Sequence, residues 1–207
     1  MGGLFYRFLA AREAKRALSA SLSEPLPAIP VIVEHNARQT VWEVRADQSS
    51  RHYLRLLHRT ADEYVVYVHA ERFYGAWLLC STVAHPRGDA CAPRRLMPKD
   101  YKYQRAVEGF SRGLPSPVPL AEVSAMERHK GIQIMFANGV TRTFWLLHNR
   151  CPSFPILVQG MEAAKLINER MGLLSGPIPT TEIAGLQRFS ASSSLGGQHL
   201  SKPAWLG

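Results

Sequence analysis

The segment that decides the fold is PVPLAEVSAMERHKGIQIMFANGVTRTFWLLHNRCPSFPILV, Pro117 to Val158 of a 207-residue chain. Runs rich in β-branched and apolar residues predict strands over Pro117–Val123, Gly131–Phe136 and Phe154–Val158. The apolar segment Thr143–His148 lies between the second and third strands and is interpreted as a helix. Strands and helices that follow one another in this order predict a fold of the α+β class.

The turn Asn138-Gly-Val-Thr-Arg142 joins the second strand to that helix. The first N–H groups of a helix have no internal partner, and the helix dipole favours anions there. A guanidinium beside such a turn adds further donors. We therefore expect a phosphate to be bound by Asn138, Gly139, Thr141 and Arg142, with Thr141 capping the helix.

The same turn has a second interpretation, because Asn-Gly between two apolar runs is the strongest short signal for a β-hairpin. The segment Gly131–Phe136 alternates in polarity, and the residues after Gly139 include β-branched ones. Local propensity leaves the hairpin and the strand–turn–helix equally open. The spacing of Val140, Phe144 and Leu147 favours the helix.

The order strand, strand, Gly-x-x-Arg turn, helix and proline-containing strand resembles the core of the ParB/sulfiredoxin fold. Gly139 and Arg142 stand at the glycine and arginine of that motif. Upstream, Tyr64–Trp77 and Lys102–Val123 resemble one branch of the superfamily, the plasmid fertility-inhibition and oncogenic-suppression proteins. Together the resemblance spans Val65 to Val158 and favours the helical interpretation of the turn.

This resemblance implies a bacterial cytoplasmic factor that blocks conjugative transfer of competing DNA, with peripheral attachment to the inner membrane as a variant. Nucleases and nucleotide-binding proteins occur in the superfamily, so DNase or ATPase activity with a divalent metal and ATP is one expectation. A non-enzymatic inhibitor that binds the conjugative coupling protein is the other. Sulfiredoxin chemistry is disfavoured, because Val140 and Thr141 stand where sulfiredoxin carries a cysteine. A DNA-binding partition protein is disfavoured too, since no helix-turn-helix follows the core.

The charge of the chain favours a polyanionic partner, since the net charge is +9 and the pI is about 9.8. Cations neutralise phosphates, and exposed tyrosine rings can stack on unpaired bases, which favours single-stranded DNA. The alternative is a solvated helix face whose tyrosines point inward. The expected nucleic-acid-binding residues are Arg94, Arg95, Lys99, Lys102, Tyr103 and Arg105.

Candidate catalytic groups are fewer. Phosphodiester hydrolysis usually needs a metal or a general base beside the phosphate. Glu71 and Asp100 are the candidates, because their segments flank the presumed site in the fold that the chain resembles; each is otherwise a surface carboxylate. The chain has no HExxH motif and no CxxC pair, so the identity of any metal stays open.

Three regions are expected along the chain. Residues 1–30 form a helix and a proline-rich connector, residues 31–175 form the ParB/sulfiredoxin-like domain, and residues 176–207 form a disordered tail rich in serine and glycine. Basic residues interrupt the apolar sequence of this first helix. A signal peptide needs an uninterrupted apolar stretch, so we do not expect one here. We expect it to dock on the domain through an apolar face made by Leu4, Phe5, Phe8 and Leu9.

Overall fold

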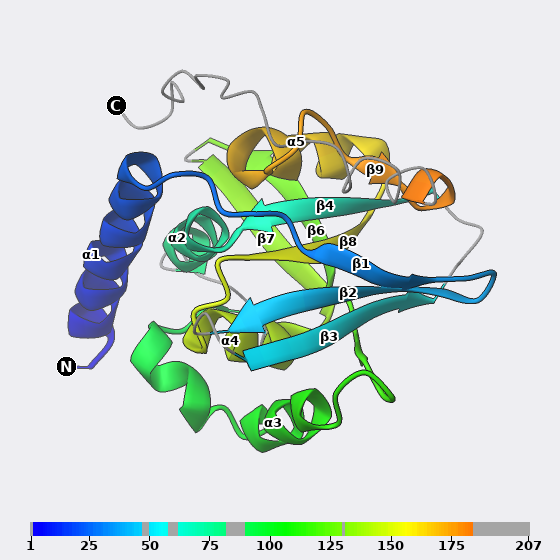
Figure 1. Ribbon diagram of the computed structural model, residues 1–207. Coiled ribbons are helices and arrows are strands. Elements are labelled where there is room, and N and C mark those ends of the chain that lie inside the picture. The colour runs from blue at the N-terminus through cyan, green and yellow to red at the C-terminus, as the bar shows by residue number, and fades with distance from the viewer. Residues whose placement is uncertain (1, 47–49, 58–61, 82–89, 130, 184–207) are drawn as a thin grey trace.

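The computed structural model describes residues 2–46, 50–57, 62–81, 90–129 and 131–183, with side chains from residue 7 onward (Figure 1). Two β-sheets and several helices make up these residues, so the predicted α+β class is confirmed. The predicted disordered tail lies largely in residues 184–207, which are outside the described residues.

The first sheet has the strand order β1-β2-β3-β5. Its strands are β1 (Val31–His35), β2 (Gln39–Ala46), β3 (Ser50–Leu57) and β5 (Val118–Pro119). The first three pair antiparallel as a meander, whereas β5 comes from far along the chain and pairs parallel to β3. This long-range pairing brings Arg55 next to Pro119, which positions one wall of the site described below.

The second sheet has the strand order β7-β6-β8-β4-β9. Its strands are β4 (Glu63–His69), β6 (Glu122–Arg128), β7 (Gly131–Asn138), β8 (Ser153–Gln159) and β9 (Ile178–Pro179). The central strands β4 and β8 are buried along almost their whole length, so their sequences read as continuous apolar runs. Strand β9 pairs with β4 and Ile183 is fully buried, so the fold continues beyond residue 175.

The named helices are α1 (Gly2–Ser23), α2 (Ala70–Ser81), the 3-10 helix η1 (Arg94–Lys99), α3 (Tyr103–Ser111), α4 (Val140–His148) and α5 (Met161–Met171). In Figure 1, α5 lies on the upper side of the second sheet and α4 on its lower side, with α3 below α4. Aromatic rings fill the space around α4. Trp145 stacks on Phe110 with centroids 4.0 Å apart, and Trp77 stacks on Phe144 at 5.2 Å.

The strand predicted over Pro117–Val123 is divided between the two sheets. Its first part is β5; its last two residues begin β6, which continues beyond the predicted strand to Arg128. The Leu120 N–H donates to the Arg55 carbonyl in one sheet, while the Ala121 carbonyl accepts from the Leu157 N–H in the other. The backbone therefore changes partners between adjacent residues, which local propensity does not reveal.

Helix α1 docks as predicted, but the expected contact face is wrong at Phe8, which is 64% exposed. The buried face is instead Ala10, Ala14, Ala17, Leu18 and Ser21. Small side chains let two helix axes approach closely, and α2 offers Gly75 at this crossing. A Cβ at Gly75 would lie 2.6 Å from Leu18 Cγ.

Candidate nucleic-acid and phosphate site

The turn after β7 is a strand–turn–helix, so the hairpin interpretation is wrong. Strand β7 ends at Asn138, Gly139 has a positive φ of 99°, and α4 begins at Val140. A Cβ at Gly139 would lie 2.7 Å from Ala121 Cα. Backbone conformation and close approach therefore both require glycine here, and Asn-Gly serves a helix entry instead of a hairpin.

Helix α4 presents free donors at its N-terminus. Its first turn is closed by the Thr143 N–H, which donates to the Gly139 carbonyl at 3.0 Å. The N–H groups of Val140, Thr141 and Arg142 precede this bond and have no partner inside the helix. Thr141 does not cap the helix as expected, because Gly139 is the N-cap and the Thr141 hydroxyl donates to Asp100 at 3.4 Å.

The guanidinium of Arg142 is engaged by the protein itself. It donates to the carbonyls of Pro119 and Leu120 at 2.8 and 3.0 Å, and to the side-chain oxygen of Asn138 at 2.9 Å. Burial lowers the pKa of Arg142, and the nearby Glu122 opposes that shift. Arg142 thus ties α4 to the crossing between the sheets, and its guanidinium donors are largely used within the protein.

The neighbours of Arg142 line a cavity of about 790 Å³, called the basic cavity here, between α3, the crossing segment and the N-terminus of α4. Its cationic side chains are Arg55, Lys102, Arg105, Arg112 and Arg142, and it has one carboxylate, Asp100. Arg55, Arg105 and Arg112 form no ion pair with the described residues, and Arg55 Nε is buried without a hydrogen-bond partner. The cavity therefore carries a surplus of unneutralised positive charge.

The structure places the predicted nucleic-acid-binding residues unevenly. Lys102 and Arg105 line the basic cavity, whereas Lys99 is exposed outside it. Two basic residues of the cavity, Arg55 and Arg112, were not predicted. Arg55 follows the alternation of a basic strand, but its place in the cavity depends on the pairing of β3 with β5, which the sequence does not show.

The burial of Tyr103 argues against its expected role in stacking on bases. Its side chain is 9% exposed, packs edge-on against His148 and accepts a hydrogen bond from Asn149. Its inward direction follows from the helical spacing of α3, which also buries Ala106 and Phe110. The neighbouring Tyr101 is 85% exposed at the cavity wall, so it is the ring that a base can reach.

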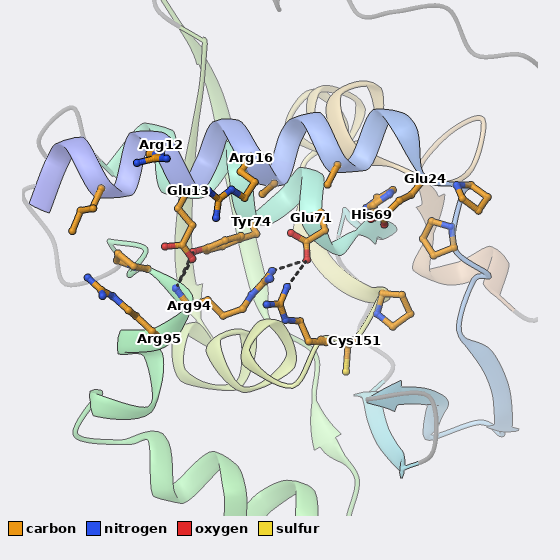
Figure 2. A pocket seen from close by; sticks show the side chains of 18 residues that line it. Arg12, Glu13, Arg16, Glu24, His69, Glu71, Tyr74, Arg94, Arg95 and Cys151 are labelled. Carbon is orange, nitrogen blue, oxygen red and sulfur yellow. Dashed lines mark hydrogen bonds and ion pairs between the residues drawn. The ribbon is translucent and has the colours of Figure 1, made fainter.

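A second cavity of about 960 Å³, called the α1 cleft here, lies between α1, the N-terminus of α2, η1 and the turn at residues 150–152 (Figure 2). Glu71, Arg94 and Arg95 line this cleft and not the basic cavity. The sequence placed them in one functional set with Asp100. The fold separates them because η1 and α3 lead the chain from one cavity to the other.

Arg94 is buried and engaged within the protein, which leaves its guanidinium little room for the predicted contact with nucleic acid. Its guanidinium donates to Glu71 Oε1 at 2.7 Å and lies 4.6 Å above the ring of Tyr74. The Arg94 backbone N–H and the Tyr74 hydroxyl both bond to the Glu13 carboxylate, which anchors α1. Figure 2 shows these contacts as one network across the cleft.

The two catalytic candidates have different surroundings. Glu71 is held by Arg94 and lies 3.9 Å from Arg150 Nη1, away from the basic cavity. Asp100 lies on the wall of the basic cavity and accepts hydrogen bonds from the Lys102 N–H and the Thr141 hydroxyl. Within the described ranges, no group of three His, Cys, Asp or Glu side chains is arranged to hold a metal ion. None of the described helices is long and apolar enough to span a bilayer.

Comparison with known proteins gives consistent results. A family model described as "Plasmid Fertility inhibition factor" matches residues 65–172. Protein osa of Shigella flexneri is 30% identical over 176 residues, which are 85% of this chain and 90% of that protein. A crystal structure of the Oncogenic Suppression Activity Protein, described as a plasmid fertility inhibition factor and solved as a gold(I) cyanide derivative, superposes with a TM-score of 0.78 at 30% identity. The match covers 90% of this chain and 98% of that one.

Proposed function

This chain belongs to the plasmid fertility inhibition factor family, and on that premise we propose that it blocks conjugative transfer of competing DNA by binding DNA or nucleotide phosphates in the basic cavity. The observation that carries the proposal is the cluster of Arg55, Arg105 and Arg112 beside the N-terminus of α4, none of which has an ion pair with a described residue. A ParB/sulfiredoxin relationship is part of the proposal, supported by the order β7, Gly139, α4, β8.

The chemistry of the cavity suits a phosphodiester chain. One guanidinium group can donate two parallel hydrogen bonds to the oxygens of a phosphate. The N–H groups at the start of α4, which have no partner inside the helix, add uncharged donors. Tyr101 lies exposed beside Lys102, whose ammonium is 5.0 Å from the ring centroid. An exposed ring next to phosphate-binding cations is typical of sites for unpaired bases, so single-stranded DNA is the proposed ligand.

Binding is tested with labelled single- and double-stranded DNA. Arg55→Gln/Arg105→Gln should weaken binding of single-stranded DNA at least about tenfold, because it removes two charge-assisted contacts. Arg38→Gln is the matched control, since Arg38 is exposed on the turn between β1 and β2, outside both cavities. Equal affinities of the double variant and the control would overturn the basic cavity as the binding site.

A catalytic form of this proposal assigns DNase or ATPase activity to the basic cavity, with a divalent metal and ATP as cofactors. Asp100 is its candidate acid or metal ligand, because it is the carboxylate on that wall. The test is hydrolysis of labelled DNA and of ATP, with and without Mg²⁺, by the wild type and by Asp100→Asn. Activity that survives Asp100→Asn unchanged removes Asp100 from the mechanism.

The second candidate function is a non-enzymatic inhibitor that binds the conjugative coupling protein. The observation that favours it is the edge strand β1 with its connector, where Ile29, Val31 and Val33 are exposed beside unpaired backbone groups. Apolar residues on an open edge are typical of protein-binding surfaces. Val31→Lys/Val33→Lys should then relieve inhibition of conjugation of a second plasmid, while Arg55→Gln/Arg105→Gln should not. The reverse result supports the DNA mechanism.

In both mechanisms the protein acts in the cytoplasm of the plasmid-bearing cell. A second form of the proposal adds peripheral contact with the inner membrane. Helix α1 exposes Arg7, Phe8, Arg12, Lys15 and Arg16, a basic surface with one aromatic residue. Such a surface attracts anionic lipid headgroups. Fractionation of cells that express the wild type or Phe8→Ser/Lys15→Gln tests this: loss of membrane association in the variant supports it.

A further inference from the structure

One residue that lines the α1 cleft is a histidine without hydrogen-bond partners among the described residues. His69 ends β4 directly before α2, is 3% exposed and lines the cleft. Neither of its ring nitrogens has a hydrogen-bond partner among the described residues. Burial and the nearby Arg72 lower the pKa of His69 to about 4, so at neutral pH the ring is uncharged and offers one N–H donor. A buried polar group of this kind is costly unless a ligand or water completes its bonding.

Further donors lie around the same point. Helix α2 begins at Ala70, whose N–H donates to the Pro152 carbonyl. The next N–H groups of this first turn have no partner inside the helix. Glu71 is the carboxylate in this turn, and its charge is balanced by Arg94 at 2.7 Å. The end of the cleft thus combines several donors with one neutralised acid.

The walls of the cleft add positive charge. Five arginines and three carboxylates line it. Arg12 and Arg16 project from α1 and Arg95 from η1 (Figure 2), and none of the three has an ion pair with a described residue. Arg150 is well exposed at the opposite wall, on a backbone with φ of 57°. Glu13 accepts from the Tyr74 hydroxyl and the Arg94 N–H through one oxygen and keeps its charge, so the formal charge of the side chains that line the cleft is +2, from five arginines and three glutamates.

We propose that the α1 cleft is a second ligand site, separate from the basic cavity, that binds a small molecule through a phosphate or carboxylate group. Its lining combines His69 and the first turn of α2 with Arg16 and Arg150. The volume of about 960 Å³ is in the range of small-molecule sites in proteins, so a metabolite or nucleotide fits. This site does not depend on the function proposed for the basic cavity.

The test uses full-length protein carrying Arg55→Gln/Arg105→Gln, so that anions binding in the basic cavity do not obscure the result. Inorganic phosphate and succinate are titrated separately, and the His69 ring nitrogens are followed by NMR, assigned by their loss in His69→Gln. We expect a saturable shift of the His69 signals with at least one of the two anions. Arg150→Gln should weaken that binding about tenfold, the effect of losing one charge-assisted contact.

Arg38→Gln is again the matched control, because it removes an exposed arginine from a loop outside the cleft. It should leave the affinity unchanged, and both variants should keep the thermal unfolding midpoint of their background. The anion that binds more tightly identifies the ligand class. The proposal is overturned if neither anion shifts the His69 signals, or if Arg38→Gln weakens binding as much as Arg150→Gln.

Discussion

At the scale of single residues, Gly139 shows how one position serves both fold and site. Its φ of 99° and the 2.7 Å approach of a Cβ to Ala121 Cα exclude any side chain without backbone movement. Gly139→Ala should lower the free energy of unfolding by about 2–4 kcal/mol, since steric conflict adds to backbone strain. Urea denaturation measures this value.

Gly113→Ala is the control for this prediction. Gly113 also has a positive φ, of 65°, but its Cβ would meet only Pro115 Cδ at 3.8 Å. Gly113→Ala should lower the free energy of unfolding by about 1–2 kcal/mol, through backbone strain alone. Equal losses at the two positions would show that the close approach to Ala121 has no energetic weight.

Arg142 should contribute more to the stability of the fold than to the binding of phosphate. Arg142→Ala leaves the carbonyls of Pro119 and Leu120 without their donor, and should lower the free energy of unfolding by about 2–3 kcal/mol. Arg142→Lys should recover little, because an ammonium cannot reproduce the planar fork of a guanidinium. Arg105→Ala, at an exposed position, should change stability by less than about 0.5 kcal/mol. An Arg142→Ala protein of normal stability that fails to bind phosphate would contradict this account.

His69 should make stability depend on pH. Its pKa in the folded protein is about 4, below the ordinary value of 6.5, so the unfolded chain binds the proton more readily. Stability is therefore fully present above about pH 6.5 and decreases as the pH falls towards 4. The loss between pH 7 and pH 5 should be about 1–2 kcal/mol. His69→Gln should remove this component in phosphate-free urea titrations; an unchanged pH dependence in the variant would assign it to other groups.

At the scale of elements, replacing either of two helical glycines with alanine should change the stability of the protein in opposite directions. Gly75→Ala places a Cβ 2.6 Å from Leu18 Cγ at the crossing of α1 and α2, so it should destabilise the protein by about 1–3 kcal/mol. Gly109→Ala in α3 meets only Val118 at 3.5 Å and should stabilise by about 0.5–1 kcal/mol through helix propensity.

Hydrogen exchange adds an element-specific readout to this pair. Gly75→Ala should reduce the protection of α1 amides more than that of α3 amides, because α1 is displaced from α2. Loss of protection spread evenly over both helices would argue against a local effect at the crossing.

At the scale of the whole molecule, part of the net charge of +9 is gathered in the basic cavity. Four of its cations, Arg55, Lys102, Arg105 and Arg112, have no ion pair with a described residue. Binding of single-stranded DNA should therefore show a log–log salt slope of about −3, at about −0.7 for each phosphate contact. Arg55→Gln/Arg105→Gln should reduce the magnitude of this slope by about 1.4. A slope that the double variant leaves unchanged would place the contacts elsewhere.

Helix α4 connects the two cavities of the molecule. Its N-terminus lines the basic cavity, and at its C-terminus the His148 ring nitrogen lies 3.3 Å from the Arg94 carbonyl oxygen beside the α1 cleft. Its nine residues span about 13 Å. The residues that the sequence grouped by proximity along the chain, Arg94 to Arg105, are thereby divided between two environments.

Local sequence patterns are sufficient to predict the elements around the Gly-x-x-Arg turn. Apolar spacing after Gly139 indicates α4, and the apolar runs Tyr64–Val68 and Phe154–Val158 indicate the two central strands, because these signals depend on short-range periodicity. The α+β class and the family resemblance follow from the order of these elements. The basic composition likewise predicts an anionic partner without any coordinates.

Only the tertiary structure decided which side chains share a site. The pairing of β3 with β5 brings Arg55 to the basic cavity, and the engagement of Arg142 by carbonyls depends on where the chain crosses between sheets. The burial of Tyr103 and the pairing of Glu71 with Arg94 also depend on contacts between elements distant in sequence. Such contacts leave no local periodicity, because they arise from long-range packing and not from the propensities of neighbouring residues.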